Sequence, residues 1–111
     1  MEEQLKAEVQ IKVLMVCLGN ICRSPTAEAV FRTKVQTENL ESHILIESAG
    51  TGSWHIGEPP DKRSMQAAII RDYDMSSQRA RQVSLQDMEE FDYIYAMDKQ
   101  NLQDLLEMCA P

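Results

Sequence analysis

A cysteine and an arginine with five residues between them are the residues in this chain best suited to covalent chemistry. Cys17 and Arg23 lie at the two ends of the segment CLGNICR, and Ser24 follows directly. A thiolate is a strong nucleophile, and a guanidinium binds two oxygens of a phosphate group at once. The pattern therefore predicts attack of the Cys17 sulfur on the phosphorus of a phosphate ester held by Arg23.

The segment between these residues, called the 18–23 loop below, suits an anion. Gly19 allows close approach of the backbone, and Asn20 tolerates the left-handed conformation that a tight loop needs. Such a loop points successive N–H groups inward as an anion-binding nest, and a following helix adds its partial positive charge. These groups favour the thiolate of Cys17, to which Ser24 is placed to donate a hydrogen bond. The expected reaction forms a cysteinyl phosphate that water then hydrolyses.

The neighbouring elements are expected to hold the loop at one edge of a sheet. Residues 9–16, VQIKVLMV, predict a buried strand before the loop. A helix is predicted after it, with Ser24 as N-cap and Pro25 in the first helical position. The inner face of this helix is expected to carry Ala27, Val30, Phe31 and Val35.

The rest of the chain alternates strands and helices. Residues 44–46 and 92–97 predict two more strands. Three further helices are expected, one after Pro60 with Met65, Ala68 and Ile69 inward, one capped by Ser84 and Asp87, and one capped by Asp98 with Leu102, Leu105, Leu106 and Cys109 on one stripe. The order β-loop-α-β-loop-α-α-β-α predicts an α/β, three-layer sandwich with a parallel sheet and a ligand site where the strands end.

Length and charge narrow the class of partner. The 111 residues predict a single domain, 1–111, with a net charge of -7 and no basic cluster, which argues against nucleic-acid binding. No apolar run is long enough for a membrane span, and the first ten residues lack the pattern of a signal peptide. The three cysteines match neither a disulfide framework nor a zinc site. We therefore expect a cytoplasmic protein with no metal, no membrane partner and no nucleic-acid partner.

The sequence resembles the low-molecular-weight protein tyrosine phosphatases. The resemblance spans residues 11–110 and rests on VCLGNICRSPTAEAVF, SAGTGSWHIGEPPD, ARQ at 80–82, FDYI at 91–94 and AMDKQNL at 96–102. It implies a flavodoxin-like fold, no cofactor, and hydrolysis of phosphotyrosine in protein substrates, with inorganic phosphate as product and inhibitor.

The resemblance also implies roles for single residues. Cys17 is the nucleophile and Arg23 the phosphate clamp, while Asn20, Ser24 and Ser48 support the loop and Trp54 lies at the pocket rim. Cys22 matches a second loop cysteine that, in the family, forms a reversible disulfide with the nucleophile. The phosphate-binding residues are Leu18, Gly19, Asn20, Ile21, Cys22 and Arg23.

Two related specificities and one other function compete with this interpretation. Phosphoarginine phosphatases of a related branch have Thr where this chain has Ile21, so Ile21 favours phosphotyrosine. Arsenate reductases of similar fold need extra redox cysteines between the second and third strands, which this sequence lacks. A phosphocysteine carrier of sugar uptake also has a Cys at a strand end, but the complete CLGNICRS match argues against it.

The resemblance is incomplete at the C-terminal end. The family's general acid is an Asp in an Asp-Pro pair beyond the third strand, and the sequence contains no such pair. Asp98 fits a helix N-cap better than a general acid, and Asp61 and Asp92 have no better claim. The family's fourth strand and last helix are also expected to be absent, through truncation or in a shortened protein. The sequence thus keeps an alternative open, a phosphate- or phosphotyrosine-binding module with little turnover, and predicts self-association through an exposed sheet edge.

Overall fold

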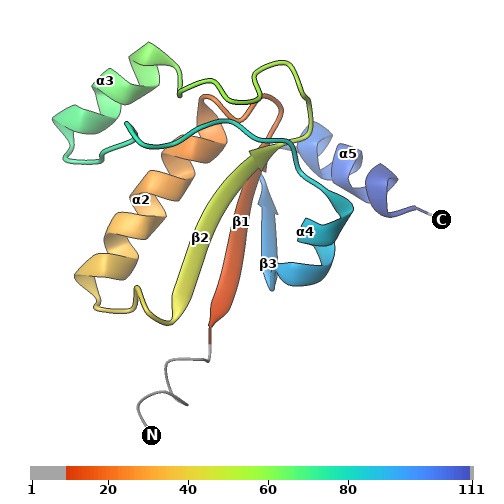
Figure 1. The fold of residues 1–111 in the computed structure, drawn as a ribbon, viewed down its shortest axis with the longest axis horizontal. Coiled ribbons are helices and arrows are strands. Elements are labelled where there is room, and N and C mark those ends of the chain that lie inside the picture. The colour runs from red at the N-terminus through yellow and green to blue at the C-terminus, as the bar shows by residue number, and fades with distance from the viewer. Residues whose placement is uncertain (1–9, 111) are drawn as a thin grey trace, which may run out of the picture.

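The computed structural model describes residues 10–110. Strands and helices alternate along the chain in the order predicted from the sequence (Figure 1). The elements are β1 (Ile11–Cys17), α2 (Arg23–Thr37), β2 (Ile44–Gly50), α3 (Lys62–Ile70), α4 (Leu85–Glu90), β3 (Tyr93–Ala96) and α5 (Lys99–Cys109).

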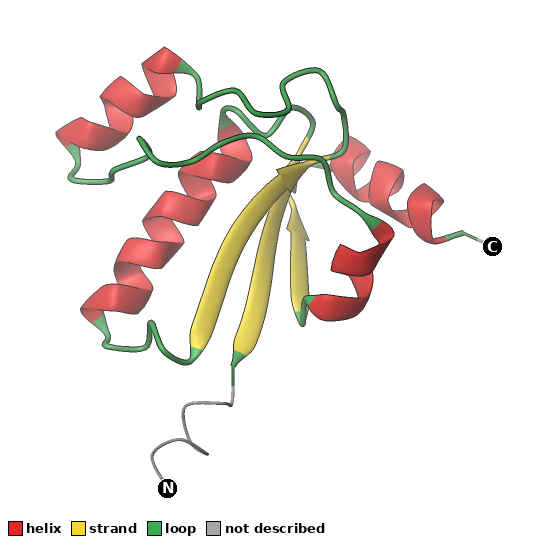
Figure 2. Cartoon of the chain, in the orientation of Figure 1, coloured by secondary structure: helices red, strands yellow, loops and turns green. Residues whose placement is uncertain are grey.

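The three strands form one parallel sheet in the order β2-β1-β3. Val13 of β1 faces Ile46 of β2 on one side and Tyr93 of β3 on the other. The chain leaves β1 toward β2 and later returns to the opposite side of β1, so the direction of winding reverses at β1 (Figure 2). Ligands of open α/β sheets bind where the direction reverses, at the carboxyl ends of the strands.

Helices cover both faces of the sheet, which makes the predicted three layers. Alternate residues of β1 point to opposite faces, as strand geometry requires. Val13 and Met15 pack with Val35 of α2, whereas Leu14 and Val16 pack with Leu105 of α5. Figure 1 shows α2 on one side of the sheet and α4 and α5 on the other. Because β1 is covered on both faces, its sequence is almost continuously apolar.

The start of α2 differs from the prediction. The helix begins at Arg23 with Cys22 in the N-cap position, and no side chain caps it. Ser24, predicted as the N-cap, lies inside the first turn and is fully buried. Its hydroxyl bonds to the Cys17 sulfur and the Asn20 side chain instead, so the first helical N–H groups stay available.

The second strand is longer than predicted, because β2 pairs with β1 as far as Gly50 opposite Cys17. On α2, Val35 is buried and Ala27 and Phe31 are partly buried as predicted. Glu28 and Ala29 are buried as well. The helix touches α3 in addition to the sheet, so it has two covered sides and lacks a single apolar stripe.

Two predicted helix faces are partly wrong. On α3 Ala68 is buried and Met65 packs against it, but Ile69 is 58% exposed. On α5 the buried side carries Asn101 and Leu105.

Three other predicted members of the α5 stripe, Leu102, Leu106 and Cys109, are exposed. This helix packs Leu105 onto the core beside β1 and also touches β3 and α4, so one narrow side is covered and the others are open. No helix between residues 10 and 110 combines the length and the apolar character needed to cross a membrane.

Candidate active site

The 18–23 loop lies at the carboxyl end of β1, where the sheet reverses its winding. Cys17 is the last residue of β1 and is 3% exposed, and α2 begins at Arg23. The continuous pairing of β1 with β2 fixes the Cys17 backbone opposite Gly50. The Cys17 sulfur therefore lies at the end of a paired strand and contacts the first turn of α2.

Two groups contact the Cys17 sulfur, one in the 18–23 loop and one in the first turn of α2. The backbone N–H of Asn20 donates to Sγ at 3.3 Å, and the Ser24 hydroxyl lies 3.0 Å from Sγ. A hydrogen bond from an N–H group and the positive end of α2 both stabilise negative charge that develops at the sulfur in a reaction. The surroundings of the sulfur thus suit a thiolate nucleophile.

The side chain of Asn20 holds the loop in shape. Its backbone has φ 57°, the left-handed conformation expected for this position. Its Nδ2 donates to Ser24 Oγ at 2.8 Å and to Ser48 Oγ at 2.9 Å, and its Oδ1 accepts from the N–H of Arg81 at 2.9 Å. The structure thus brings together the three residues predicted to support the loop.

The backbone of the loop leaves its N–H groups for a ligand. Two of its carbonyl oxygens bond to groups outside the loop: Leu18 O accepts from Gly52 N at 2.9 Å, and Ile21 O accepts from Asp61 N at 2.7 Å. Within residues 10–110 the N–H groups at positions 18, 19 and 21–23 form no hydrogen bond to another backbone group. Carbonyls turned out and N–H groups left unused make a nest for an anion.

Arg23, the first residue of α2, is paired with Asp98. Its Nη1 donates to Asp98 Oδ2 at 2.7 Å, and the two side chains are 50% and 42% exposed. This hydrogen bond raises the pKa of Arg23. The N–H of Asn101 and, next, the Arg23 side chain hold the pKa of Asp98 below its usual value. The Arg23 guanidinium is therefore bound to Asp98 in this structure.

The aspartates considered as general acids all hold structural positions. Asp98 accepts from the Asn101 N–H at 2.8 Å and is the N-cap of α5, as predicted. Asp61 caps α3, and Asp92 Oδ2 accepts from the Lys12 N–H at 2.8 Å. Each of these three carboxylates thus accepts a structural hydrogen bond from a backbone N–H.

Comparison with known proteins decides the family. The family model "Low molecular weight phosphotyrosine protein phosphatase" matches residues 12–111. The chain belongs to this family.

Individual relatives agree with this assignment. The low molecular weight protein-tyrosine-phosphatase YfkJ of Bacillus subtilis is 49% identical over 100 residues, which are 90% of this chain and 64% of that protein. The human low molecular weight phosphotyrosine protein phosphatase is 50% identical over 93 residues, 84% of this chain and 58% of that protein. The chain thus spans less than two thirds of the length of these relatives.

A solved structure gives the same result for the fold. The crystal structure of a protein tyrosine phosphatase from Entamoeba histolytica with Hepes in its active site superposes with a TM-score of 0.87 at 42% identity. The superposition covers 91% of this chain and 64% of that one. The predicted α/β, flavodoxin-like fold of the low molecular weight phosphatases is confirmed.

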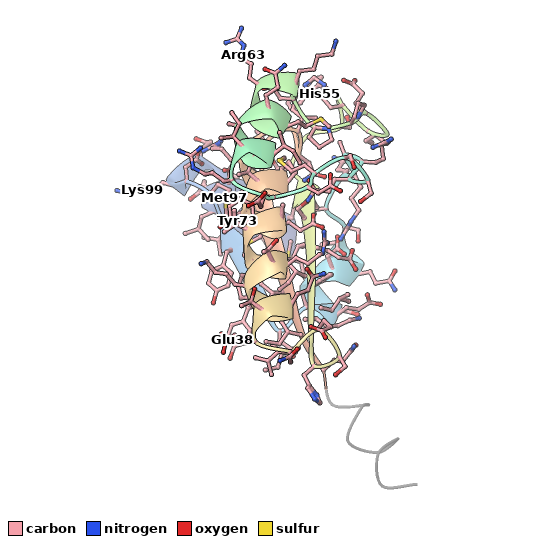
Figure 3. All side chains as sticks on the ribbon, turned by 90° about the vertical axis from the view of Figure 1, so that its left-hand side faces the viewer. Glu38, His55, Arg63, Tyr73, Met97 and Lys99 are labelled. Carbon is pink, nitrogen blue, oxygen red and sulfur yellow. The ribbon has the colours of Figure 1, made fainter. Side chains whose placement is uncertain are left out.

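A pocket beside the 18–23 loop of this family member carries aromatic and acidic side chains. Trp54, predicted at the rim, is 68% exposed and lines an open pocket of about 420 Å³. Leu18 of the loop lies on the same pocket, together with Asp104 and Glu107 of α5. His55 packs against Gly19, where a Cβ would lie only 3.0 Å from Cδ2 of the imidazole ring. Figure 3 shows His55 at the same end of the molecule as Arg63 of α3, with Glu38 at the opposite end.

The cysteines of this family member are all free thiols. Cys17 is buried, whereas Cys22 is exposed, with its Sγ 3.1 Å from the Ser64 hydroxyl. The disulfide between Cys17 and Cys22 therefore stays a prediction.

Three residues near the loop were missed by the sequence analysis. Arg81 reaches Asn20 through its backbone, and its side chain pairs with Asp87 at 2.9 Å. Glu28 accepts from the Ser48 hydroxyl, and Arg32 pairs with Glu28. The only available signals were the positions of Arg81 in the ARQ segment and of Glu28 in the loop signature, and neither predicts such a contact by itself.

Proposed function

We propose that this chain is a protein tyrosine phosphatase that hydrolyses phosphotyrosine monoesters through a phosphate bound to Cys17. The observation that carries the proposal is the Cys17 sulfur, which accepts the Asn20 N–H and contacts the Ser24 hydroxyl at the start of α2. Membership of the phosphatase family supports it. Because the relatives are longer than this chain, the activity and the substrate class are proposed for it and not carried over from them.

The first proposed step transfers the phosphoryl group to sulfur. The thiolate of Cys17 attacks phosphorus, an S–P bond forms, and the bond from phosphorus to the tyrosyl oxygen breaks. The tyrosyl oxygen leaves with the electron pair and takes a proton from solvent. The N–H groups of the 18–23 loop and the Arg23 guanidinium bind the equatorial oxygens, where negative charge is concentrated.

The second proposed step releases phosphate. Water attacks phosphorus, the S–P bond breaks, and Cys17 leaves as a thiolate that the Ser24 hydroxyl stabilises. The water proton passes to solvent, and inorganic phosphate occupies the nest as product and competitive inhibitor. Asn20, Ser24 and Ser48 keep the loop in shape through both steps, and Trp54 contacts the ring of the substrate. Ile21 favours phosphotyrosine over phosphoarginine.

Release of p-nitrophenol from p-nitrophenyl phosphate tests the proposal. This leaving group departs easily and needs little help from a general acid. We expect turnover by the parent and by Cys109→Ser, a control that alters an exposed thiol on α5, and none by Cys17→Ser. A folded parent without turnover would contradict the enzyme proposal. If that parent still bound vanadate, the phosphate-binding module would be the better description.

A second proposal concerns self-association. The outer edge of β3 has no strand partner within residues 10–110, and Tyr93 and Tyr95 beside it are 52% and 49% exposed. Unpaired edges pair with other strands, so we propose that two copies of the 111-residue chain associate through β3. Sedimentation of the chain and of Tyr95→Lys tests this, because a monomeric parent would contradict it.

We also propose a cytoplasmic location. A thiolate nucleophile such as Cys17 must stay reduced, and so must the exposed thiols of Cys22 and Cys109. Cell fractionation with an antibody to the protein checks this, and recovery in an oxidising compartment would contradict it.

A further inference from the structure

The open pocket of about 420 Å³ lies between the 18–23 loop and α5, directly beside the nucleophile. Leu18, the residue that follows Cys17, lines it. Trp54 lines it as well, and its indole ring packs onto Gly52, where a Cβ would clash with the ring. Because Trp54 is nevertheless 68% exposed, most of its surface is open to a ligand. The pocket thus has an apolar wall next to the place where a phosphotyrosine would bind.

The α5 side of this pocket is acidic. Asp104, Glu107 and Met108 line it, since positions three and four apart share one face of a helix. Asp104 accepts from Gln100 at 3.0 Å and Glu107 accepts from Gln103 at 3.4 Å, and both donors are neutral amides. In the part of the chain that the structure describes, neither carboxylate pairs with a basic side chain. The pocket therefore carries two negative charges that no cation balances there.

Two further features of the pocket favour a cation with several N–H groups. The helix α5 ends at Cys109 with no basic residue in its last turn, and the carbonyl end of a helix carries a partial negative charge. The Thr51 hydroxyl oxygen, on the same pocket, is buried and has no hydrogen-bond partner among residues 10–110. Buried polar groups are normally paired, so this oxygen lacks a partner that a ligand rich in N–H donors would supply.

A long basic side chain fits each part of this lining. Its methylene stem packs on apolar groups such as Leu18 and Met108, while its charged end reaches the carboxylates of Asp104 and Glu107. A cation is also attracted to the face of an indole ring such as that of Trp54. Arginine suits the pocket better than lysine, because its planar guanidinium binds a carboxylate through two N–H groups and stacks on aromatic rings.

We propose that this pocket is a substrate subsite that binds a basic side chain, preferably arginine, a few residues from the phosphotyrosine of the protein substrate. The inference rests on the proposed function, in which the phosphotyrosine enters the nest beside Leu18. Asp104 and Glu107 determine specificity and do not touch the reacting phosphoryl group. A substrate with acidic neighbours is disfavoured, because those neighbours meet two carboxylates of the same charge.

The rates of matched phosphotyrosine peptides test the proposal. The peptides carry Arg, Gln or Glu in turn at each position that flanks the phosphotyrosine, and phosphate release gives kcat/KM. At the best position we expect the parent to prefer Arg over Gln about tenfold, from exposed charge pairs and one contact with the indole ring. The variant with Asp104→Asn and Glu107→Gln should reduce this preference to about twofold or less. A ratio of two peptides cancels any effect on the chemistry that they share.

A matched control separates this pocket from the net charge of the protein. Glu38 and Glu41 lie between α2 and β2, and Figure 3 shows Glu38 at the opposite end of the molecule from His55, which packs on the loop. Glu38→Gln with Glu41→Gln removes the same number of charges and should keep the full preference for Arg. Equal kcat/KM for all the peptides, or a preference that survives loss of both α5 carboxylates, would overturn the proposal.

Binding to an inactive variant separates this proposal from the phosphatase proposal. Cys17→Ser keeps the pocket, so fluorescence anisotropy of labelled peptides measures the subsite without turnover, and Arg peptides should bind about tenfold more tightly than Gln peptides. If the parent hydrolyses neither the peptides nor p-nitrophenyl phosphate, the phosphatase proposal fails, and these affinities decide the subsite: equal values overturn it. If the parent hydrolyses all the peptides equally well, the phosphatase proposal stands and the subsite proposal fails.

Discussion

Replacement of Asn20 by alanine should damage both the stability and the activity of this protein. Asn20 is 3% exposed and makes three side-chain hydrogen bonds, to Ser24, Ser48 and the backbone of Arg81. Its φ of 57° lies in the left-handed region, where alanine is strained. Asn20→Ala therefore removes three bonds and adds backbone strain at one position.

The size of the effect follows from these contacts. Each buried hydrogen bond contributes about 1 kcal/mol net to stability, and the left-handed backbone costs a non-glycine residue about 1 kcal/mol or more. The sum for Asn20→Ala is about 4 kcal/mol, a large part of the roughly 5–15 kcal/mol that stabilises a typical domain. A shift of the loop by about 1 Å would in addition lower kcat/KM about 100-fold.

Urea unfolding of the parent, Asn20→Ala and Asn20→Gly measures the two contributions separately. Glycine loses the same three bonds but tolerates the backbone, so Asn20→Gly should be somewhat more stable than Asn20→Ala, although its freer unfolded chain offsets part of the gain. A loss below about 1 kcal/mol for Asn20→Ala, with unchanged kcat/KM, would refute the role of these bonds in holding the loop.

Three further substitutions test other parts of the site. Asp98→Ser keeps an N-cap for α5 but frees Arg23, so phosphate should inhibit about two- to fivefold more strongly, as measured by its Ki; weaker inhibition would contradict competition between Asp98 and phosphate. Burial opposes ionisation of Asp87, but hydrogen bonds led by that from Arg81 lower its pKa below the usual value. The ionised Asp87 carboxylate therefore contributes its full stabilising free energy above about pH 4, the pKa of the unfolded state. This contribution is lost as pH falls through the pKa of the folded state, which is lower. Asp87→Asn should be less stable in urea at neutral pH and should lose less stability below pH ~4 than the parent, and parallel curves would contradict this. Cys22→Ser should recover less activity with dithiothreitol after peroxide treatment, because no neighbouring thiol remains to trap the oxidised nucleophile as a disulfide; equal recovery would argue against that disulfide.

The order of elements and the reactive loop could be predicted from the sequence because their causes are local. The capping box of Ser84 and Asp87 and the N-cap Asp98 both appear as predicted, since each bond joins residues three positions apart. The apolar run before Cys17 likewise predicts a covered strand whatever lies on either side of it. The loop conformation at Asn20 follows from the same kind of local preference.

Tertiary structure decided which helix faces are buried. Leu102 and Leu106 of α5 are apolar but exposed, whereas Asn101 is 2% exposed. Periodicity shows that a helix has an apolar side, but the neighbours determine which side is covered. The exposure of Ile69 on α3 has the same cause.

The support of the site also depends on distant parts of the chain. Asn20 bonds to a backbone group 61 residues away, and Arg23 pairs with a carboxylate 75 residues away. The types and spacing of Cys17 and Arg23, together with the strand and helix predicted on either side of them, predict phosphate-ester chemistry from the sequence. The contacts from Arg81, Glu28 and Asp98 that shape the site exist only because the parallel crossovers return distant segments to the end of β1. No local pattern encodes such contacts, because their energy depends on pairs of residues that are close only in the folded state.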